Sequence, residues 1–158
     1  MPYAMREYRP SDAALMPEIF RSAVSVSARR HYNDRQVTVW LSRTPNAETF
    51  AENYSNGRLA MMIVNQENRP VGFADVEEDG HIQYFYCHPE LSGSGMADVL
   101  LRALEVAARE RKLSRLYVEA SETALGLFKR NGFDVVKRRD FKISGVPIHN
   151  YAMEKVLK

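Results

Sequence analysis

Cysteine is almost absent from this 158-residue chain: Cys87 is the single one, so no intrachain disulfide can form. A lack of disulfides fits a reducing compartment. No apolar run approaches the ~20 residues that a helix needs to span a bilayer. The first seven residues, MPYAMRE, lack the basic and apolar regions of a signal peptide. These absences predict a soluble cytoplasmic protein with no membrane partner.

A dominant charge of either sign is also missing. Twenty-two Lys and Arg residues oppose twenty Asp and Glu residues, which leaves a net charge of +2. Nucleic-acid-binding domains usually carry a clear basic excess, so no nucleic-acid partner is expected. The basic run Lys137-Arg138-Arg139 is interrupted by Asp140, and we interpret it as a solvated strand face. No metal site is expected, because no two of the histidines have ligand spacing. They are His31, His81, His88 and His149.

The composition is that of an ordinary globular protein, with 45% hydrophobic and 27% charged residues. At ~150 residues per domain, the length predicts one domain over residues 1–158. Internal repeats and linker-like tracts are lacking. The chain is therefore interpreted as one compact unit.

Hydrophobic periodicity divides the chain into strands and helices. The clearest helix begins near Met96, where apolar residues recur at helical spacing. Other helices are expected from Ser11 or Asp12 (later if Pro17 delays it), after Asn33, from Thr44-Pro45 to about Tyr54, and over 122–130. Strands are expected near 3–9, 59–64, 71–76, 81–87, 116–120, 133–142 and 148–157. A strand–loop–helix–strand unit over 81–121 predicts one parallel strand pair.

A glycine-bearing loop joins the strand ending at Cys87 to this helix. Closely spaced glycines let a backbone approach a ligand, and successive N–H groups at a helix start attract anions. The loop therefore indicates a phosphate-bearing ligand, and a tight structural turn is the alternative. It is not a Walker loop, because no Gly-Lys-Ser/Thr follows, and the third position of the dinucleotide fingerprint is missing. A nucleotide-binding module stays open on this evidence.

Two motifs in order resemble the GNAT superfamily of N-acetyltransferases. The family's acetyl-CoA loop, R/Q-x-x-G-x-G/A, corresponds to Ser92-Gly93-Ser94-Gly95-Met96-Ala97, after Cys87-His88-Pro89. The second block, N-x-x-A-x-x-x-Y-x-x-x-G-F, corresponds to Ser121, Ala124, Phe128, Gly132 and Phe133. More narrowly, this region is similar to the bacterial YafP-like branch. The resemblance implies an α/β (α+β) fold: a mixed, mostly antiparallel twisted sheet of about six to seven strands with helices on both faces.

The resemblance also implies acetyl-CoA as co-substrate and a set of cofactor-binding positions. They are Tyr86, Cys87, Ser92, Gly93, Ser94, Gly95, Met96, Ala97, Ser121 and Phe128. The residues themselves add Lys129 and Arg130, near the end of the short helix, as candidates for contact with the cofactor's phosphates, with a solvated helix end as the alternative. Three of these positions depart from the family pattern. Ser92 stands for Arg or Gln, Ser121 for Asn, and Phe128 for the Tyr that often protonates the CoA thiolate. Phe128 has no proton to give.

Glu119, Tyr84 and Tyr86 are the catalytic candidates. Alternation along strand 116–120 places Glu119 on the face opposite Leu116 and Val118. Burying a carboxylate there costs free energy unless the group takes part in catalysis or has an ion-pair partner. Glu119 is therefore either the general base or the partner of an arginine such as Arg115 or Arg138. Tyr84 and Tyr86 on the neighbouring strand either donate to the thiolate or bind substrate, with packing as the alternative.

The leading prediction is an acetyl-CoA-dependent N-acetyltransferase that acts by direct attack in a ternary complex. Its acceptor is a small-molecule or peptide amine, and residues 15–54 and the last turn of the chain are expected to shape the acceptor pocket. The alternative from another class is a non-catalytic acyl-CoA-binding sensor or interaction module on the same fold. An exposed strand edge near the C-terminus could support a homodimer.

Overall fold

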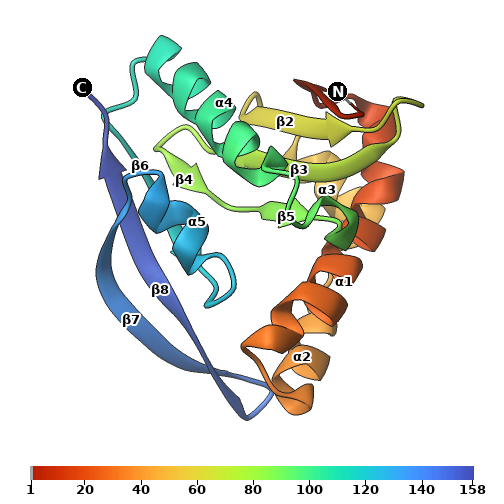
Figure 1. Ribbon diagram of the computed structural model, residues 1–158, viewed down its shortest axis with the longest axis vertical. Coiled ribbons are helices and arrows are strands. Elements are labelled where there is room, and N and C mark those ends of the chain that lie inside the picture. Colours follow the sequence, from red (N-terminus) through yellow and green to blue (C-terminus); the bar gives the residue numbers. More distant parts are fainter. Residues whose placement is uncertain (1) are drawn as a thin grey trace.

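The computed structural model describes residues 2–158, which form eight strands and five α-helices (Figure 1). The strands are β1 (Ala4–Glu7), β2 (Leu59–Val64), β3 (Pro70–Val76), β4 (His81–Ile82), β5 (Phe85–Cys87), β6 (Arg115–Ala120), β7 (Asp134–Ile143) and β8 (Val146–Val156). The helices are α1 (Met16–Val26), α2 (Asp34–Leu41), α3 (Ala47–Asn53), α4 (Met96–Glu110) and α5 (Leu125–Arg130). Short 3₁₀ turns cover Pro10–Leu15, Ser27–Arg30 and Pro89–Leu91.

The strands form two four-stranded sheets, in the orders β1-β2-β3-β5 and β4-β6-β8-β7. Every pair is antiparallel except β4 with β6. The mixed, mostly antiparallel architecture and its one parallel pair are thus confirmed. In Figure 1 the first sheet runs across the upper part of the molecule, while β6, β7 and β8 descend away from it. The two sheets therefore diverge beyond their junction.

The junction between the sheets is made by a buried carboxylate. The sequence predicts one strand over 81–87, but this segment is split into β4 and β5 at Gln83 and Tyr84. Both of these residues donate their backbone N–H to Oδ1 of Asp75, each at 2.9 Å. Asp75 is fully buried, and its other oxygen accepts from Arg58 at 2.6 Å. The carboxylate replaces the backbone partner of two successive residues, so the strand bends and its halves join different sheets.

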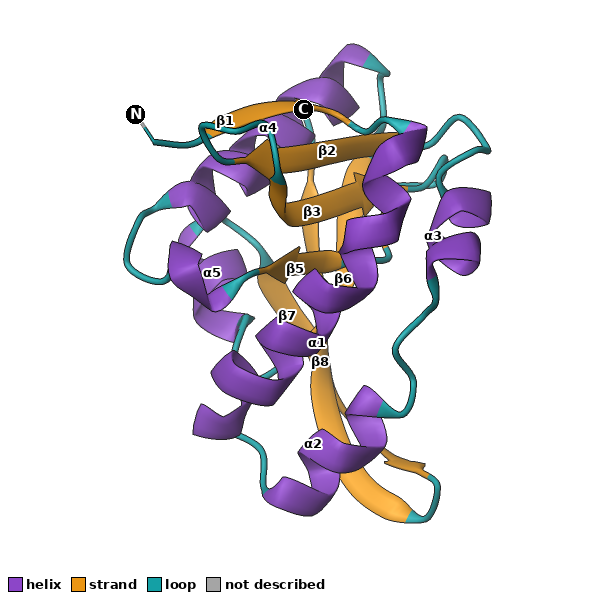
Figure 2. Cartoon of the chain, turned by 90° about the vertical axis from the view of Figure 1, so that its right-hand side faces the viewer, coloured by secondary structure: helices purple, strands orange, loops and turns teal. Residues whose placement is uncertain are grey.

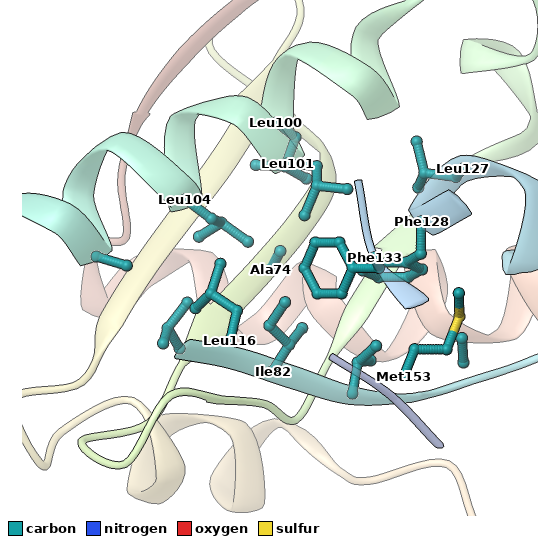
Figure 3. Close-up of a cluster of buried hydrophobic side chains, with 14 of the residues drawn as sticks. Ala74, Ile82, Leu100, Leu101, Leu104, Leu116, Leu127, Phe128, Phe133 and Met153 are labelled. Carbon is teal, nitrogen blue, oxygen red and sulfur yellow. The ribbon is translucent and has the colours of Figure 1, made fainter. Parts of the chain in front are cut away.

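Helices cover both faces of the sheets, as expected. Helices α1, α2 and α3 pack over one face around residues such as Phe50 and Phe73, on the side that faces the viewer in Figure 2. Helices α4 and α5 cover the other face. Their apolar side chains meet Ala74, Leu116 and Met153 from the strands (Figure 3). Leu100, Leu101 and Leu104 supply the buried stripe of α4 that the periodicity predicts.

Three helices begin later than the first candidate positions in the sequence. The start of α1 follows the predicted alternative, in which Pro17 delays it. The first α-helix begins at Met16, so that Pro17 lies in its first turn, where a missing N–H costs nothing. The third begins at Ala47 because the side chain of Asn46, not Thr44, accepts from Thr49 N at 2.8 Å. In α5 the start shifts to Leu125, after a turn at Ser121.

None of the helices that residues 2–158 form is long and apolar enough to cross a membrane.

Candidate active site

Two cavities meet where the sheets part. The larger, about 450 Å³, lies between β5, the glycine-bearing loop, α1 and α5. The smaller, about 170 Å³, lies between β5, β6 and the β7–β8 hairpin. Five residues line both cavities and mark the passage between them: Trp40, Phe85, Tyr86, Ser121 and Ala124. The gap between β5 and β6 therefore joins the two cavities.

The glycine-bearing loop presents unpaired backbone donors to the larger cavity. Gly93 and Gly95 have φ angles of 75° and 79°, and a Cβ at either position would meet nothing within 4 Å. Within residues 2–158, the N–H groups of Gly93, Gly95 and Ala97 have no hydrogen-bond partner. Together with the dipole of the 15-residue helix α4, they form an anion-binding surface.

The other predicted loop residues are divided between the cavity and the core. Ser92 and Cys87 line the larger cavity. Ser94 turns back, since its Oγ donates to the carbonyl of Leu91 and accepts from Met96 N. Met96 is 3% exposed and belongs to the core around α4.

Of the two candidate cations at the end of α5, one lines a cavity. Lys129 is exposed and lines neither cavity, whereas its neighbour Arg130 lines the larger one. Arg130 forms a two-pronged pair with Asp98, both contacts at 2.8 Å. This hydrogen bonding lowers the pKa of Asp98 to about 2. Arg130 is thereby held at the rim of the cavity.

The backbone of β5 also points donors into the gap. Tyr84 accepts from Asp75 N through its carbonyl, and His88 donates its N–H to Val71. Alternate residues of an antiparallel strand direct their N–H groups to opposite edges. The backbone N–H of Cys87 is therefore directed away from β3, into the gap beside β6.

The smaller cavity is lined mainly by aromatic and aliphatic side chains. Tyr32, Trp40, Phe141, Ile143 and Ile148 form much of its wall. Two of the predicted site residues that depart from the family pattern also reach it. Ser121 lines both cavities, and Phe128 borders the smaller one while being only 1% exposed.

The three catalytic candidates have different surroundings. Tyr86 lines both cavities, and its ring packs against Phe20 with 4.4 Å between centroids. Burial raises the pKa of Tyr86 well above its ordinary value. Glu119 lines the smaller cavity. Tyr84 lines neither; it lies among the aromatic rings below α3, and its hydroxyl accepts from Asn53 at 3.1 Å.

Glu119 is paired, but with a histidine rather than with an arginine. His81 holds the Glu119 carboxylate through Nε2 and that of Glu77 through Nδ1, each at 2.7 Å. Arg115 and Arg138, the partners expected from the sequence, pair instead with Glu154 and Asp140. The hydrogen bond from His81 lowers the pKa of Glu119, and the two carboxylates raise that of His81 to about 9. His81 and Glu119 therefore form an ion pair across the parallel β4–β6 pair at neutral pH.

A pH-dependent contribution to stability follows for His81. A histidine whose pKa is raised on folding contributes its full stabilisation below its unfolded pKa of ~6.5 and loses it as pH rises through the folded value. For His81 that window runs from about 6.5 to about 9. We expect His81→Gln to lower the free energy of unfolding by roughly 1–2 kcal/mol at pH 6 and by little at pH 10.

Urea denaturation of both proteins at pH 6, 8 and 10 measures this difference. His31→Gln is the matched control, because the His31 ring bonds the Thr123 hydroxyl instead of a carboxylate. A difference for His81→Gln that is constant over this range contradicts the ion pair.

A second carboxylate–histidine pair lies at the far end of β6, and nothing in the sequence pattern singles it out. Glu122 accepts from His149 Nε2 and from the Tyr151 hydroxyl, each at 2.9 Å. Its backbone N–H donates to the Tyr32 hydroxyl, which in turn donates to the carbonyl of His149. These contacts fix the α1–α2 connection against β8.

Comparison with known proteins agrees with this geometry. The family model described as "Acetyltransferase (GNAT) domain" matches residues 28–155. The uncharacterized N-acetyltransferase YafP of Escherichia coli (strain K12) is 30% identical over 149 residues, covering 94% of this chain and 93% of that protein. The crystal structure of a GCN5-related N-acetyltransferase from Rhodopseudomonas palustris superposes with a TM-score of 0.88 at 31% identity, over 99% of this chain and 97% of that one.

A more distant structure shares the fold. It is a GNAT-superfamily phosphinothricin acetyltransferase from Sinorhizobium meliloti in complex with acetyl-CoA, with a TM-score of 0.78 at 19% identity, over 99% of this chain and 89% of that one. The family match, the identity to YafP and the fold agree. This chain belongs to the GNAT family of acetyltransferases.

Proposed function

We propose that this protein transfers the acetyl group of acetyl-CoA to an amine by direct attack in a ternary complex. The observation that carries the proposal is the pair of cavities joined through the gap between β5 and β6. The larger has anion-binding backbone groups, and the smaller has an aromatic wall with a carboxylate. Acetyl-CoA occupies the larger cavity, the amine occupies the smaller one, and the acetyl group lies at the passage.

The loop residues hold the diphosphate of acetyl-CoA in this proposal. The unpaired N–H groups of Gly93, Gly95 and Ala97 supply most of the affinity, so the small side chain of Ser92 suffices. Arg130 at the rim adds a cation for the phosphates. Lys129, which points elsewhere, supplies only long-range attraction. Met96 and Ser94 act indirectly, by fixing the start of α4.

Three groups of the chain serve the chemical step. The N–H of Cys87 polarises the thioester carbonyl from the edge of β5. Glu119 accepts the proton of the amine as the C–N bond forms and the nitrogen becomes acidic. The neutral Tyr86 hydroxyl donates to the leaving thiolate. No strong acid is needed there, because the pKa of a thiol is only ~8.5, and the absence of a hydroxyl at Phe128 is therefore tolerated. Tyr84 supports β5 by packing.

A thiol-release assay tests the proposal. Acetyl-CoA is incubated with the protein and a panel of primary amines, and free CoA is detected with a thiol-reactive dye. We expect amine-dependent release with at least one class of amine. Tight binding of acetyl-CoA without release on any amine would overturn transfer and favour an acyl-CoA sensor. A melting temperature that is raised by ATP and not by CoA would overturn the choice of co-substrate.

A further inference from the structure

Arg139 is a cation without a carboxylate partner beside the smaller cavity. Its Nη1 donates to Oδ1 of Asn150 at 3.0 Å, and its guanidinium lies 5.4 Å from the centre of the Phe141 ring. Both neighbours line the cavity. Within residues 2–158, no Asp or Glu oxygen lies within 4 Å of Arg139, whereas the adjacent Arg138 pairs with Asp140 at 3.1 Å. Most of the donors of this half-buried guanidinium are therefore unused.

Strand register places Arg139 on the same face of the sheet as Glu119. In the antiparallel pairs, Arg139 lies opposite Asn150 and Glu119 lies opposite Ala152. Residues directly opposite one another share a face, as do Asn150 and Ala152, which are two apart on β8. Arg138 lies opposite Tyr151 and so faces the other way.

The space between these two charged groups is open to a small ligand. On β8, Ala152 lies opposite Glu119 and Asn150 lies opposite Arg139, and both Glu119 and Asn150 line the smaller cavity. Two strand spacings separate β6 from β7, roughly 10 Å. Glu119 is already paired with His81 at 2.7 Å, so the guanidinium of Arg139 stays available to an anionic group of a ligand. Walls of Trp40 and Ile143 complete the cavity with apolar surface.

We infer that the acceptor amine also carries an anionic group, in the simplest case a carboxylate, which Arg139 binds while the amine faces Glu119. The inference rests on the proposed function and narrows its substrate to amino-acid-like molecules with an apolar side chain. A planar guanidinium binds a carboxylate through two parallel hydrogen bonds, which fixes both the position and the orientation of the ligand. Polyamines, which carry a second positive charge, are disfavoured by Arg139.

Matched pairs of acceptors test the inference. The thiol-release assay compares L-phenylalanine with phenethylamine and L-methionine with 3-(methylthio)propylamine, so that each pair differs only in the carboxylate, and spermidine is included. We expect kcat/KM to favour the amino acid of each pair by at least ~10-fold. Arg139→Gln should raise KM for the amino acids roughly 10- to 100-fold and leave KM for the decarboxylated amines nearly unchanged. Arg138→Gln, one residue away on the opposite face, is the control and should behave as wild type.

A binding measurement separates this inference from the proposed function. N-acetyl-L-phenylalanine retains the carboxylate after transfer, so its affinity for the CoA-loaded protein is measured by calorimetry without turnover. Weaker binding to Arg139→Gln than to wild type supports the inference even if no amine is acetylated. Acetylation of amines with no preference for the carboxylate, or equal product affinity in the two proteins, overturns the inference and leaves acetyl transfer standing.

Discussion

Gly95→Trp is expected to lower the affinity for acetyl-CoA by at least ~100-fold. Gly95 precedes α4 with φ at 79° and faces the larger cavity, where a Cβ meets nothing within 4 Å. An indole at this position therefore enters the space that we propose for the diphosphate rather than the core. The backbone of the introduced tryptophan also favours a negative φ, because the left-handed conformation costs a non-glycine residue ~1–2 kcal/mol. Relaxation to a negative φ would turn the loop N–H groups away from the ligand.

Isothermal titration with acetyl-CoA and with CoA measures this effect. Gly57→Trp is the matched control, since Gly57 has φ at 81° and equally open space, but lies in the α3–β2 connection and lines neither cavity. The two variants carry the same backbone strain, so a difference in affinity between them reports the loop alone. Unchanged affinity in Gly95→Trp would remove the diphosphate from this loop.

Glu119→Gln should reduce turnover roughly 100-fold at neutral pH, the size of effect that general base catalysis usually supplies. Affinity for acetyl-CoA should stay within about twofold of wild type, because Glu119 lines only the smaller cavity. The amide keeps the shape of the side chain and an oxygen that can accept from His81. The variant therefore removes the basic group and leaves the packing between β4 and β6 intact.

Glu77→Gln separates the role of Glu119 from the charge of His81. Glu77 bonds the other ring nitrogen of His81, also at 2.7 Å, and lines neither of the two joined cavities. Both variants weaken a hydrogen bond of the His81 imidazolium, but only Glu119→Gln alters the smaller cavity. The kcat of Glu77→Gln should therefore stay near wild type across the pH range. Full activity of Glu119→Gln over the same range would exclude Glu119 as the base.

Much of the fold and the place of the glycine-bearing loop could be predicted because those signals are local in the sequence. The stripe of α4, the capping side chain of Asn33 and the glycines before Met96 act within a few residues of one another. The order of elements then fixed the single parallel pair, as the crossover from β4 through α4 to β6 requires.

The smaller cavity could not be predicted to the same depth, because its lining depends on strand register between distant segments. His81 forms a hydrogen bond with Glu119, which is 38 positions away in the sequence, and neither residue type predicts the other as its partner. The isolated acid in Val71-Gly72-Phe73-Ala74-Asp75-Val76 was the available signal for a break at Gln83, since a charge amid buried residues needs partners. The same limit applies to Tyr84. Strand alternation predicts the face of the sheet on which its side chain lies, but not the side chains that surround it.

The Asp75 carboxylate keeps β5 apart from β6 in the folded protein. The free-energy cost of separating these strands is therefore met during folding, before a ligand binds. Because the carboxylate caps the N–H groups of Gln83 and Tyr84 while the protein folds, no interstrand hydrogen bond has to break when a ligand arrives. We therefore expect the association rate to be set by diffusion into an open gap, without a preceding opening step. The same arrangement limits adaptation, since a gap with fixed edges accepts ligands by shape and charge and cannot close around a poorly fitting one.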